Sequence, residues 1–237
     1  MTISRDMWPE NVFVLIPSYQ SAGPLRPLLA GLLEMVPAKN VCVVDDASLD
    51  GTDRVCADAR VGYIGHPENQ GKGASLSDGF RHLVDRCKAQ WILTMDADGQ
   101  HAVEDIPAFI HYIGRFPYIG VCVGARSLTP AKMPLSRILS NTLTSWMLSL
   151  LTGQPIPDSQ CGFRIYSARL LQRVSCVNAR FEMESEILLK AARLRFPIGH
   201  VKVQTLYFNG ASHIRLFRDT LRWIRSIVRV WRELRKP

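Results

Sequence analysis

Short apolar runs alternate with segments of helical periodicity through the first half of the chain. Five runs have the length and β-branched content of buried strands: Val12–Ile16, Val41–Val44, Val61–Ile64, Trp91–Thr94 and Ile119–Val123. Between them, apolar residues recur at helical spacing over Leu25–Met35 and Lys72–Cys87, and Gly51-Thr52 offers a start for another helix. This alternation predicts an α/β fold with a mostly parallel sheet flanked by helices.

The second half changes character after Arg126. A Pro-bearing loop leads to an uncharged apolar stretch at Ile138–Leu151, and an amphipathic helix is expected at Phe181–Leu194, followed by a strand at Val201–Phe208. The fourteen residues of Ile138–Leu151 are too few to cross a bilayer. They fit either an ordinary buried helix or a helix resting in a membrane interface that guides a lipid. We expect no membrane-spanning helix.

Residues 214–237 carry most of the net charge. The chain has a formal charge of +8, and this segment holds eight basic and two acidic residues, which leaves +2 for residues 1–213. Arginines recur in steps of three and four beside an apolar arc that includes Ile224, Val228 and Trp231. The pattern predicts a basic amphipathic helix that lies on an anionic membrane or packs on the protein or on a second subunit. We expect a domain over 1–213 with a helical tail over 214–237.

Composition narrows the cellular setting and the partners. The six cysteines show no C-x-x-C spacing and lie in or beside apolar runs, so we expect reduced core thiols and a cytoplasmic protein. Neither a P-loop nor a G-x-G-x-x-G fingerprint occurs at the expected place. The basic tail lacks the aromatic surface on which single strands stack, so we expect no nucleic acid partner.

An acidic cluster follows the fourth predicted strand. Asp96 and Asp98 are two residues apart, where strand alternation points both side chains the same way, and Gln100 adds an amide oxygen. Such oxygens suit Mg²⁺ or Mn²⁺, and Mg²⁺ keeps its other positions for water and phosphate oxygens. An isolated D-x-D is also a common solvated turn. With its neighbours, the cluster points to chemistry on a diphosphate.

Other polar clusters follow the neighbouring strands. Pro17-Ser18-Tyr19 comes after the first strand and Asp45-Asp46 after the second, and ligands of such sheets bind beyond these carboxyl ends. A carboxylate there can accept hydrogen bonds from a base or a ribose. The segment Glu68–Gly73 brings glycines that allow close backbone approach, and Lys72, which can counter phosphate charge. Each segment alone also fits an ordinary turn.

Five motifs stand in a fixed order: Ile16-Pro17-Ser18-Tyr19, Val43–Thr52, Asn69–Gly73, Asp96–His101 and Gly162-Phe163-Arg164. Together they resemble family-2 glycosyltransferases over residues 11–215, and among these the dolichyl- or polyprenyl-phosphate sugar transferase branch. The resemblance implies a GT-A (Rossmann-like) fold, a nucleotide-diphosphate sugar donor, a divalent metal (Mg²⁺ or Mn²⁺) and inversion at the anomeric carbon.

The resemblance also implies roles by position. It assigns nucleotide binding to four residues: Pro17, Tyr19, Asp45 and Asp46. It assigns the metal and the donor diphosphate to three: Asp96, Asp98 and Gln100. In the polyprenyl-phosphate branch, arginines like Arg126 and Arg137 meet the acceptor phosphate, although either could also be a solvated surface charge.

The acceptor decides whether a base is needed. A phosphate monoester is already an anion, whereas an alcohol must lose a proton to a carboxylate, for which we consider Asp158 and then Glu184 or Glu186. The segment 207–213 departs from the branch, because Tyr207 stands where an arginine is common and His213 where a lysine is common. His213 either touches phosphate or is structural, and Arg215 or Arg218 can substitute.

We therefore expect an inverting, metal-dependent glycosyltransferase that moves a sugar to a lipid-linked acceptor such as polyprenyl phosphate. It would work at the inner face of the membrane, with peripheral contact through residues 214–237. One alternative is a glycosyltransferase that acts on a hydroxyl of another lipid or of a glycan. A second is a nucleotidyltransferase, which would release pyrophosphate. A third is a non-enzymatic membrane or nucleic-acid adaptor that uses the basic tail.

Overall fold

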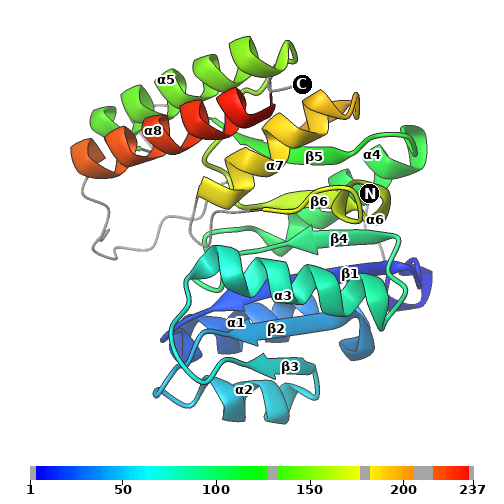
Figure 1. Ribbon diagram of the computed structural model, residues 1–237. Helices are drawn as coiled ribbons and strands as arrows, with labels where there is room; N and C mark the ends of the chain where they lie inside the picture. The colour runs from blue at the N-terminus through cyan, green and yellow to red at the C-terminus, as the bar shows by residue number, and fades with distance from the viewer. Residues whose placement is uncertain (1–3, 128–132, 177–181, 205–215, 235–237) are drawn as a thin grey trace.

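The computed structural model describes residues 4–127, 133–176, 182–204 and 216–234, and only the backbone within 216–221 (Figure 1). Its centre is one seven-stranded sheet in the order β3-β2-β1-β4-β6-β5-β7. The strands are β1 (Val12–Ser18), β2 (Val41–Asp45), β3 (Gly62–Gly65), β4 (Trp91–Thr94), β5 (Val121–Arg126), β6 (Arg164–Ser167) and β7 (Ile198–Val203).

All pairings are parallel except those of β6, which runs antiparallel to β4 and to β5. Strand β1, which lies between β2 and β4, is buried along its whole length. A near-continuous apolar run is typical of a parallel strand that is covered on both faces. The predicted α/β fold with a mostly parallel sheet is confirmed.

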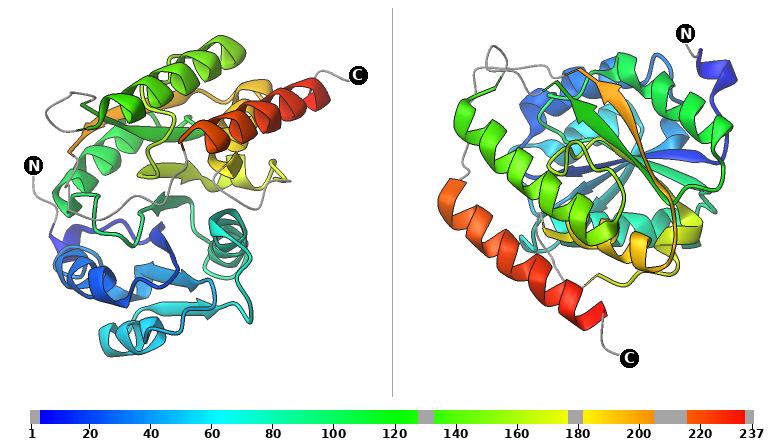
Figure 2. Two further views of the ribbon diagram at one scale, coloured as in Figure 1. Left: turned by 90° about the vertical axis from the view of Figure 1, so that its left-hand side faces the viewer. Right: turned by 90° about the horizontal axis from the view of Figure 1, so that it is seen from above.

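Helices cover both faces of the sheet. They are α1 (Ala22–Leu32), α2 (Thr52–Ala59), α3 (Lys72–Asp85), α4 (Ile106–Arg115), α5 (Leu135–Thr152), α6 (Ala168–Leu171), α7 (Glu182–Arg193) and α8 (Leu216–Leu234), with short 3₁₀ turns at Arg5–Met7, Ala38–Asn40 and Val103–Asp105. In Figures 1 and 2, α3 and α7 lie on one face, and α1 and α4 lie on the other. Connections between parallel strands usually contain a helix that packs on a face of the sheet, as α1 does between β1 and β2.

Several predicted elements shift or were missed. The strand predicted at Val201–Phe208 begins earlier, at Ile198, and residues 205–208 lie outside the described residues. Strand β6 was not predicted as a strand, because Arg164 and Ser167 break its apolar pattern although all four residues are buried. The uncharged stretch predicted at Ile138–Leu151 is helical and extends to Leu135–Thr152.

Helix α8 packs against α7 and α5 (Figure 2). Ile227 and Val230 are buried, and Trp223, Trp231 and Leu234 pack partly buried against the core. These five residues of the apolar arc therefore pack on the protein, which was one of the placements expected for the tail. The predicted boundary at 213/214 falls outside the described residues, so the domain division stays a prediction. Within the described residues, no helix is both long and apolar enough to cross a membrane.

The six cysteines are free thiols, as expected. Four are buried: Cys42, Cys56, Cys122 and Cys161. Burial raises the pKa of Cys42 and of Cys56 to about 12 in each case, so these thiols stay protonated at neutral pH. They behave as small apolar core residues.

Candidate active site

The candidate site lies at the carboxyl ends of β1, β2 and β4. The chain passes from β1 to β2 on one side and returns through β4 on the other side of β1, so the strand order reverses there. In open α/β sheets, ligands bind in the crevice outside such a switch point. The backbone N–H of Asp46 donates to the carbonyl of Ser18 over 2.9 Å, which holds the ends of β1 and β2 together.

Asp96 and Lys72 form the central ion pair of the site. Lys72 comes from the first turn of α3 and Asp96 follows β4, and Lys72 Nζ lies 2.6 Å from Asp96 Oδ1. Lys72 Nζ also donates to Glu184 Oε2 over 3.3 Å, which brings in α7. Three segments far apart in sequence therefore meet around one ammonium group.

Both members of the pair are ionised. Burial works against ionisation of the Asp96 carboxyl, yet Lys72 and the electrostatic influence of His101 lower its pKa to about 2. Burial likewise works against the charged Lys72, but Asp96 and Glu184 hold its pKa above the usual range. Both groups are charged at neutral pH, so the site has a fixed anion and a fixed cation side by side.

Asp98 and Gln100 stand at the outer end of the same turn. The Asp98 side chain is exposed, and Asp98 Oδ1 accepts from the Gln100 N–H over 2.9 Å. Partial desolvation by the surrounding protein and the nearby charge of Asp96 raise the pKa of Asp98. A nearby cation would relieve that repulsion, so the turn presents an anionic site to solvent.

His101 orders the Asp96 turn, a role that the sequence pattern did not reveal. The Asp96 N–H donates to His101 Nδ1 over 3.1 Å, and the His101 ring stacks on Phe163 with ring centres 4.9 Å apart. Burial lowers the pKa of His101 to about 4 despite the Asp96 charge. The neutral ring therefore carries its proton on Nε2, which lies 4.0 Å from Asp96 Oδ2.

Gly162 leaves the space that the ion pair occupies. A Cβ atom at this position would lie 2.7 Å from Asp96 Oδ2 and 2.9 Å from Lys72 Nζ. Any larger residue would displace the pair. The Gly-Phe-Arg motif thus acts in three ways, because Phe163 supports His101 and the fully buried Arg164 donates to the carbonyls of Ser159, Cys161 and Glu184.

Asp45 and Asp46 are buried and already hydrogen-bonded within the protein. Asp45 accepts from Ser48 and from the Tyr63 hydroxyl, the latter over 2.9 Å. Asp46 accepts the N–H groups of Gln70 and Gly71 over 2.8 and 2.7 Å, and its Oδ1 lies 2.8 Å from His66 Nδ1. Asp46 thereby fixes the loop that leads to Lys72. Their predicted contact with a nucleotide stays a prediction.

Pro17 and Tyr19 flank the end of β1. Pro17 is buried within the strand, whereas the Tyr19 side chain is exposed just beyond it. An exposed aromatic ring beside the buried carboxylates of Asp45 and Asp46 offers a stacking surface for a base. The structure therefore brings together the four residues expected to bind the nucleotide.

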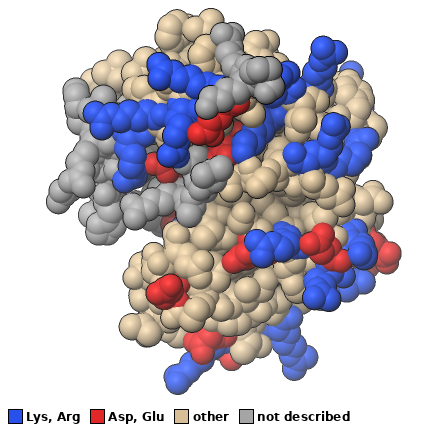
Figure 3. Space-filling model, viewed as in Figure 1, with Lys and Arg blue, Asp and Glu red and all other residues tan. Residues whose placement is uncertain are grey.

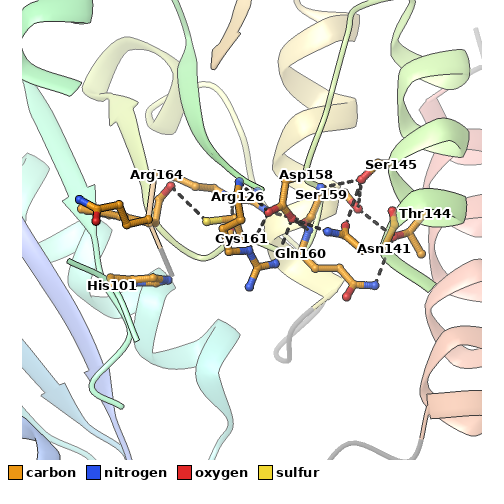
Figure 4. A network of polar contacts seen from close by, with 12 residues as sticks. His101, Arg126, Asn141, Thr144, Ser145, Asp158, Ser159, Gln160, Cys161 and Arg164 are labelled. Atoms are coloured by element: carbon orange, nitrogen blue, oxygen red, sulfur yellow. Dashed lines mark hydrogen bonds and ion pairs between the residues drawn. The ribbon is translucent and has the colours of Figure 1, made fainter. Parts of the chain in front are cut away.

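Asp158 and Arg126 form a second ion pair, at the end of β5 (Figure 4). Arg126 Nε and Nη2 donate to Asp158 Oδ2 and Oδ1 over 2.7 and 3.0 Å, and the Arg126 N–H also donates to Oδ2. Asn141 Nδ2 and the Gln160 N–H donate to Oδ1 as well. Burial opposes the charge of Asp158, but these hydrogen bonds lower its pKa. Asp158 is thus a poor proton acceptor that orients Arg126.

Helix α5 turns a polar face toward this pair. Asn141, Thr144 and Ser145 are buried, and the hydroxyls of Thr144 and Ser145 contact Ser159 Oγ at 2.8 and 3.2 Å (Figure 4). The partly buried Arg137 lies one turn before Asn141 on the same helix, so it belongs to this side. Arg137 therefore lies on the face of α5 that carries Asn141, a partner of Asp158.

Two further predicted residues were Glu184 and Glu186. Both are buried in α7, but only Glu184 reaches the site, through Lys72. Glu186 pairs instead with Lys190. Of these two candidate bases, Glu184 is therefore the one that lies at the site. Tyr207, His213 and Arg215 lie outside the described residues, as does the side chain of Arg218.

The residues around Asp98 fit a divalent cation that is shared with a substrate. Asp96, Asp98 and Gln100 supply hard oxygen donors, as Mg²⁺ and Mn²⁺ prefer. No group of three His, Cys, Asp or Glu side chains forms a full metal cage in the described part of the chain. A bound diphosphate would have to complete the coordination.

Comparison with known proteins agrees with this geometry. Residues 13–176 match the family described as Glycosyl transferase family 2. The chain is 29% identical over 220 residues to the UDP-N-acetylglucosamine–dolichyl-phosphate N-acetylglucosaminyltransferase of Methanococcus voltae, covering 83% of this chain and 86% of the relative. It is 30% identical over 172 residues to the undecaprenyl-phosphate mannosyltransferase of Micrococcus luteus, covering 69% of each.

The fold is also that of a solved glycosyltransferase. Glucosyl-3-phosphoglycerate synthase from Mycobacterium tuberculosis, crystallised with Mn²⁺, UDP-glucose and phosphoglyceric acid, superposes with a TM-score of 0.73 at 13% identity. The match covers 93% of this chain and 79% of that one. The family match over most of the chain and the shared GT-A-like fold lead to one conclusion: this protein belongs to glycosyl transferase family 2 and is a glycosyltransferase.

Proposed function

We propose that the protein transfers a sugar from a nucleotide-diphosphate donor to polyprenyl phosphate, with inversion at the anomeric carbon. The observation that carries this proposal is the meeting of Asp96, Asp98 and Lys72 at the switch point of the sheet. The cluster combines carboxylates with one ammonium group. That combination suits a diphosphate, which needs positive charge around its oxygens and a counter-ion between them.

The donor binds along the ends of β1, β2 and β4. Tyr19 stacks on the base, and Pro17, Asp45 and Asp46 shape the nucleotide pocket. Asp96, Asp98 and Gln100 hold Mg²⁺ or Mn²⁺, and the bound ion would act as a Lewis acid on the departing diphosphate. Lys72 adds a fixed positive charge beside Asp96. The Mn²⁺ and UDP-glucose bound to the structural neighbour support this arrangement.

The acceptor approaches from the side of α5. Arg126 and Arg137 provide two cations near a helix that is lined with hydroxyl and amide groups. A phosphate oxygen of the acceptor forms a bond to the anomeric carbon as the bond from that carbon to the donor diphosphate breaks. The nucleoside diphosphate leaves on the opposite face, which inverts the configuration.

A phosphate acceptor agrees with the state of Asp158. This carboxylate is fully buried, accepts hydrogen bonds from Arg126, Asn141 and Gln160, and has a lowered pKa. It is therefore badly suited to remove a proton from an alcohol. The names of the two curated relatives, one for dolichyl phosphate and one for undecaprenyl phosphate, support the same acceptor class.

One observation favours a second candidate, a hydroxyl acceptor on a lipid or glycan. Glu184 Oε1 is buried and has no hydrogen-bond partner among the described residues. A carboxylate oxygen in that state can accept a proton or a sugar hydroxyl. Replacing Glu184 with Gln separates the two cases, because an essential base would be lost whereas a phosphate acceptor would still react.

A lipid-linked acceptor would require work at a membrane surface. We place the protein at the inner face of the cytoplasmic membrane, in peripheral contact through residues 214–237. The arginines of α8 support this position, because Arg222, Arg225, Arg229 and Arg232 are all exposed.

The test is a donor screen with UDP- and GDP-sugars, Mg²⁺ or Mn²⁺, and either polyprenyl phosphate or no acceptor. We expect nucleoside diphosphate and a sugar-phosphate lipid only when acceptor and metal are present. Release of pyrophosphate would instead indicate a nucleotidyltransferase, and transfer only to neutral alcohols would refute the phosphate acceptor. Determining the anomeric configuration of the product by NMR tests inversion.

A further inference from the structure

Helix α5 buries several polar residues and exposes large apolar ones. Its buried positions include Asn141, Thr144 and Ser145, whereas its exposed positions carry large apolar side chains. We call these exposed residues the α5 stripe: Leu135, Leu139, Leu143, Trp146 and Leu150, which are 65, 70, 44, 62 and 67% exposed. Five large apolar side chains therefore face solvent on one helix, and grouped exposed apolar residues, unlike scattered ones, often mark an interaction site.

The spacing of the α5 stripe makes it continuous. Its members follow one another in steps of four, four, three and four residues, so they share one face of the helix. From Leu135 to Leu150 the stripe is about 22 Å long at 1.5 Å per residue. Arg137 is the single charged residue of α5, and it lies on the buried side. No charge therefore interrupts the stripe.

Positive charge lies next to the α5 stripe. Helices α5 and α8 run side by side at the same end of the molecule (Figures 1 and 2). One side of α8 is buried against the protein. Ile224 and Val228 are half-exposed, and the arginines of the helix from Arg222 onward are exposed. In Figure 3, basic side chains gather over α8, below the largely uncharged surface of the upper edge.

We propose that the α5 stripe, flanked by the exposed arginines of α8, is the surface that docks on a bilayer containing anionic phospholipid. The stripe enters the boundary between headgroups and acyl chains, and the arginines meet the lipid phosphates. The sequence pattern offered two surfaces for this purpose, the apolar arc of α8 and the uncharged stretch Ile138–Leu151, which lies in α5. In the folded protein much of that arc is buried against α7 and α5, so α5 supplies the inserted face instead.

A second copy of the chain fits the α5 stripe less well. A stripe of about 22 Å on a helix about 10 Å wide covers roughly 220 Å². A stable protein interface buries about 800 Å² on each partner. An interfacial helix, in contrast, buries one apolar face alone in lipid and gains from cations along its side.

Docking in this way places the candidate site beside the membrane. The inner face of α5 contacts Asp158 and Ser159, and the outer face is the stripe, so one helix thickness separates the two. This inference rests on the proposed function in that it names the surface that brings the enzyme to a lipid acceptor. Its test, however, needs neither donor nor acceptor.

The test is co-sedimentation of the full chain with phosphatidylcholine vesicles, with and without phosphatidylglycerol. We expect binding to the anionic vesicles that weakens as salt is raised. Leu139→Ser combined with Trp146→Ser should lower the partition coefficient by at least about tenfold, because two exposed apolar anchors are lost. The matched control is Tyr118→Ser, an exposed apolar residue in the α4–β5 connection, which should leave binding unchanged.

Two further measurements test whether the α5 stripe enters the lipid and whether the arginines of α8 contribute to binding. Brominated lipid should quench a tryptophan signal that Trp146→Phe removes. Arg225→Gln with Arg232→Gln should weaken binding to anionic vesicles only, whereas Arg54→Gln on the exposed side of α2 should have no effect.

Unchanged partitioning of the Leu139/Trp146 variant would overturn the proposal. So would a wild-type chain that ignores vesicles but forms a concentration-dependent dimer that this variant abolishes, because the second copy would then be the partner. Turnover with a short, water-soluble prenyl phosphate should stay within about twofold of wild type in the stripe variant. If the wild-type chain shows no turnover with this acceptor, the proposed function is contradicted, whereas the result on vesicle binding is unaffected.

Discussion

Lys72 Nζ lies 2.6 Å from Asp96 Oδ1, so a lysine from the start of α3 neutralises the aspartate that follows β4. The Lys72 side chain is 15% exposed and that of Asp96 30%. Few water molecules can therefore replace either partner. The pair joins the loop anchored by Asp46 to the acidic turn that carries Asp98, so it links the segment after β3 to the segment after β4.

Replacing Lys72 with Met should destabilise the protein. Asp96 and Glu184 would lose their common partner, and a partly buried carboxylate without one costs about 1–3 kcal/mol. Urea unfolding at pH 7 measures this loss. Lys39→Met at an exposed position is the matched control and should have an effect within about 0.5 kcal/mol.

The same pair predicts an acid transition. The pKa of Asp96 is about 2 in the folded chain against an ordinary value of 3.8, so its charge stabilises the fold above pH 3.8. This contribution, about 2 kcal/mol, disappears as the pH falls from 3.8 toward 2. The Lys72→Met variant should show a smaller acid loss than wild type. Equal acid loss in both proteins would contradict the assignment to this pair.

His101 predicts a second pH dependence at milder pH. Its pKa is about 4 in the folded protein against an ordinary 6.5, so the unfolded chain binds a proton first as the pH falls. Stability contributed by the neutral ring is complete above pH 6.5 and decreases by about 3 kcal/mol down to pH 4. His101→Gln should remove this part of the slope, whereas His200→Gln at an exposed position should keep it.

Asp98→Ala should abolish turnover and leave the fold intact. The exposed side chain makes one hydrogen bond, to the Gln100 N–H, so its removal should change the melting temperature little. Loss of a diphosphate or metal ligand should lower kcat by at least about a hundredfold. Asp53→Ala, on the exposed side of α2, is the control. Turnover close to wild type in Asp98→Ala would exclude Asp98 as a ligand.

Gly162→Ala tests the space around the ion pair. The new Cβ would lie 2.7 Å from Asp96 Oδ2, so the pair must move, and small displacements of a binding group can lower the rate about a hundredfold. Gly114→Ala in α4 is the control, since no atom lies within 4 Å of its added Cβ. That variant should keep full activity and gain up to about 1 kcal/mol in stability. Similar kinetics for both variants would show that the absence of a side chain at Gly162 is not needed for the ion pair of Lys72 and Asp96.

Much of the fold follows from local pattern. Val12–Ile16 and Trp91–Thr94 are continuous apolar runs, and they form the central parallel strands because such runs need cover on both faces. The antiparallel β6 could not be found in this way. Arg164 looks like a surface residue in the sequence, but it is fully buried because three backbone carbonyls accept its guanidinium hydrogens.

The sequence by itself determined the acidic turn at Asp96, the α/β class and the amphipathic character of the last helix, because each depends on neighbouring residues and on their spacing. Only the tertiary structure decided which partners these groups meet. It brought Asp96 and Glu184 to Lys72 and tied Asp158 to Arg126. It also covered much of the apolar arc of α8 while leaving that of α5 exposed. Periodicity shows that a helix has an apolar face, but long-range packing decides whether protein or another surface covers that face.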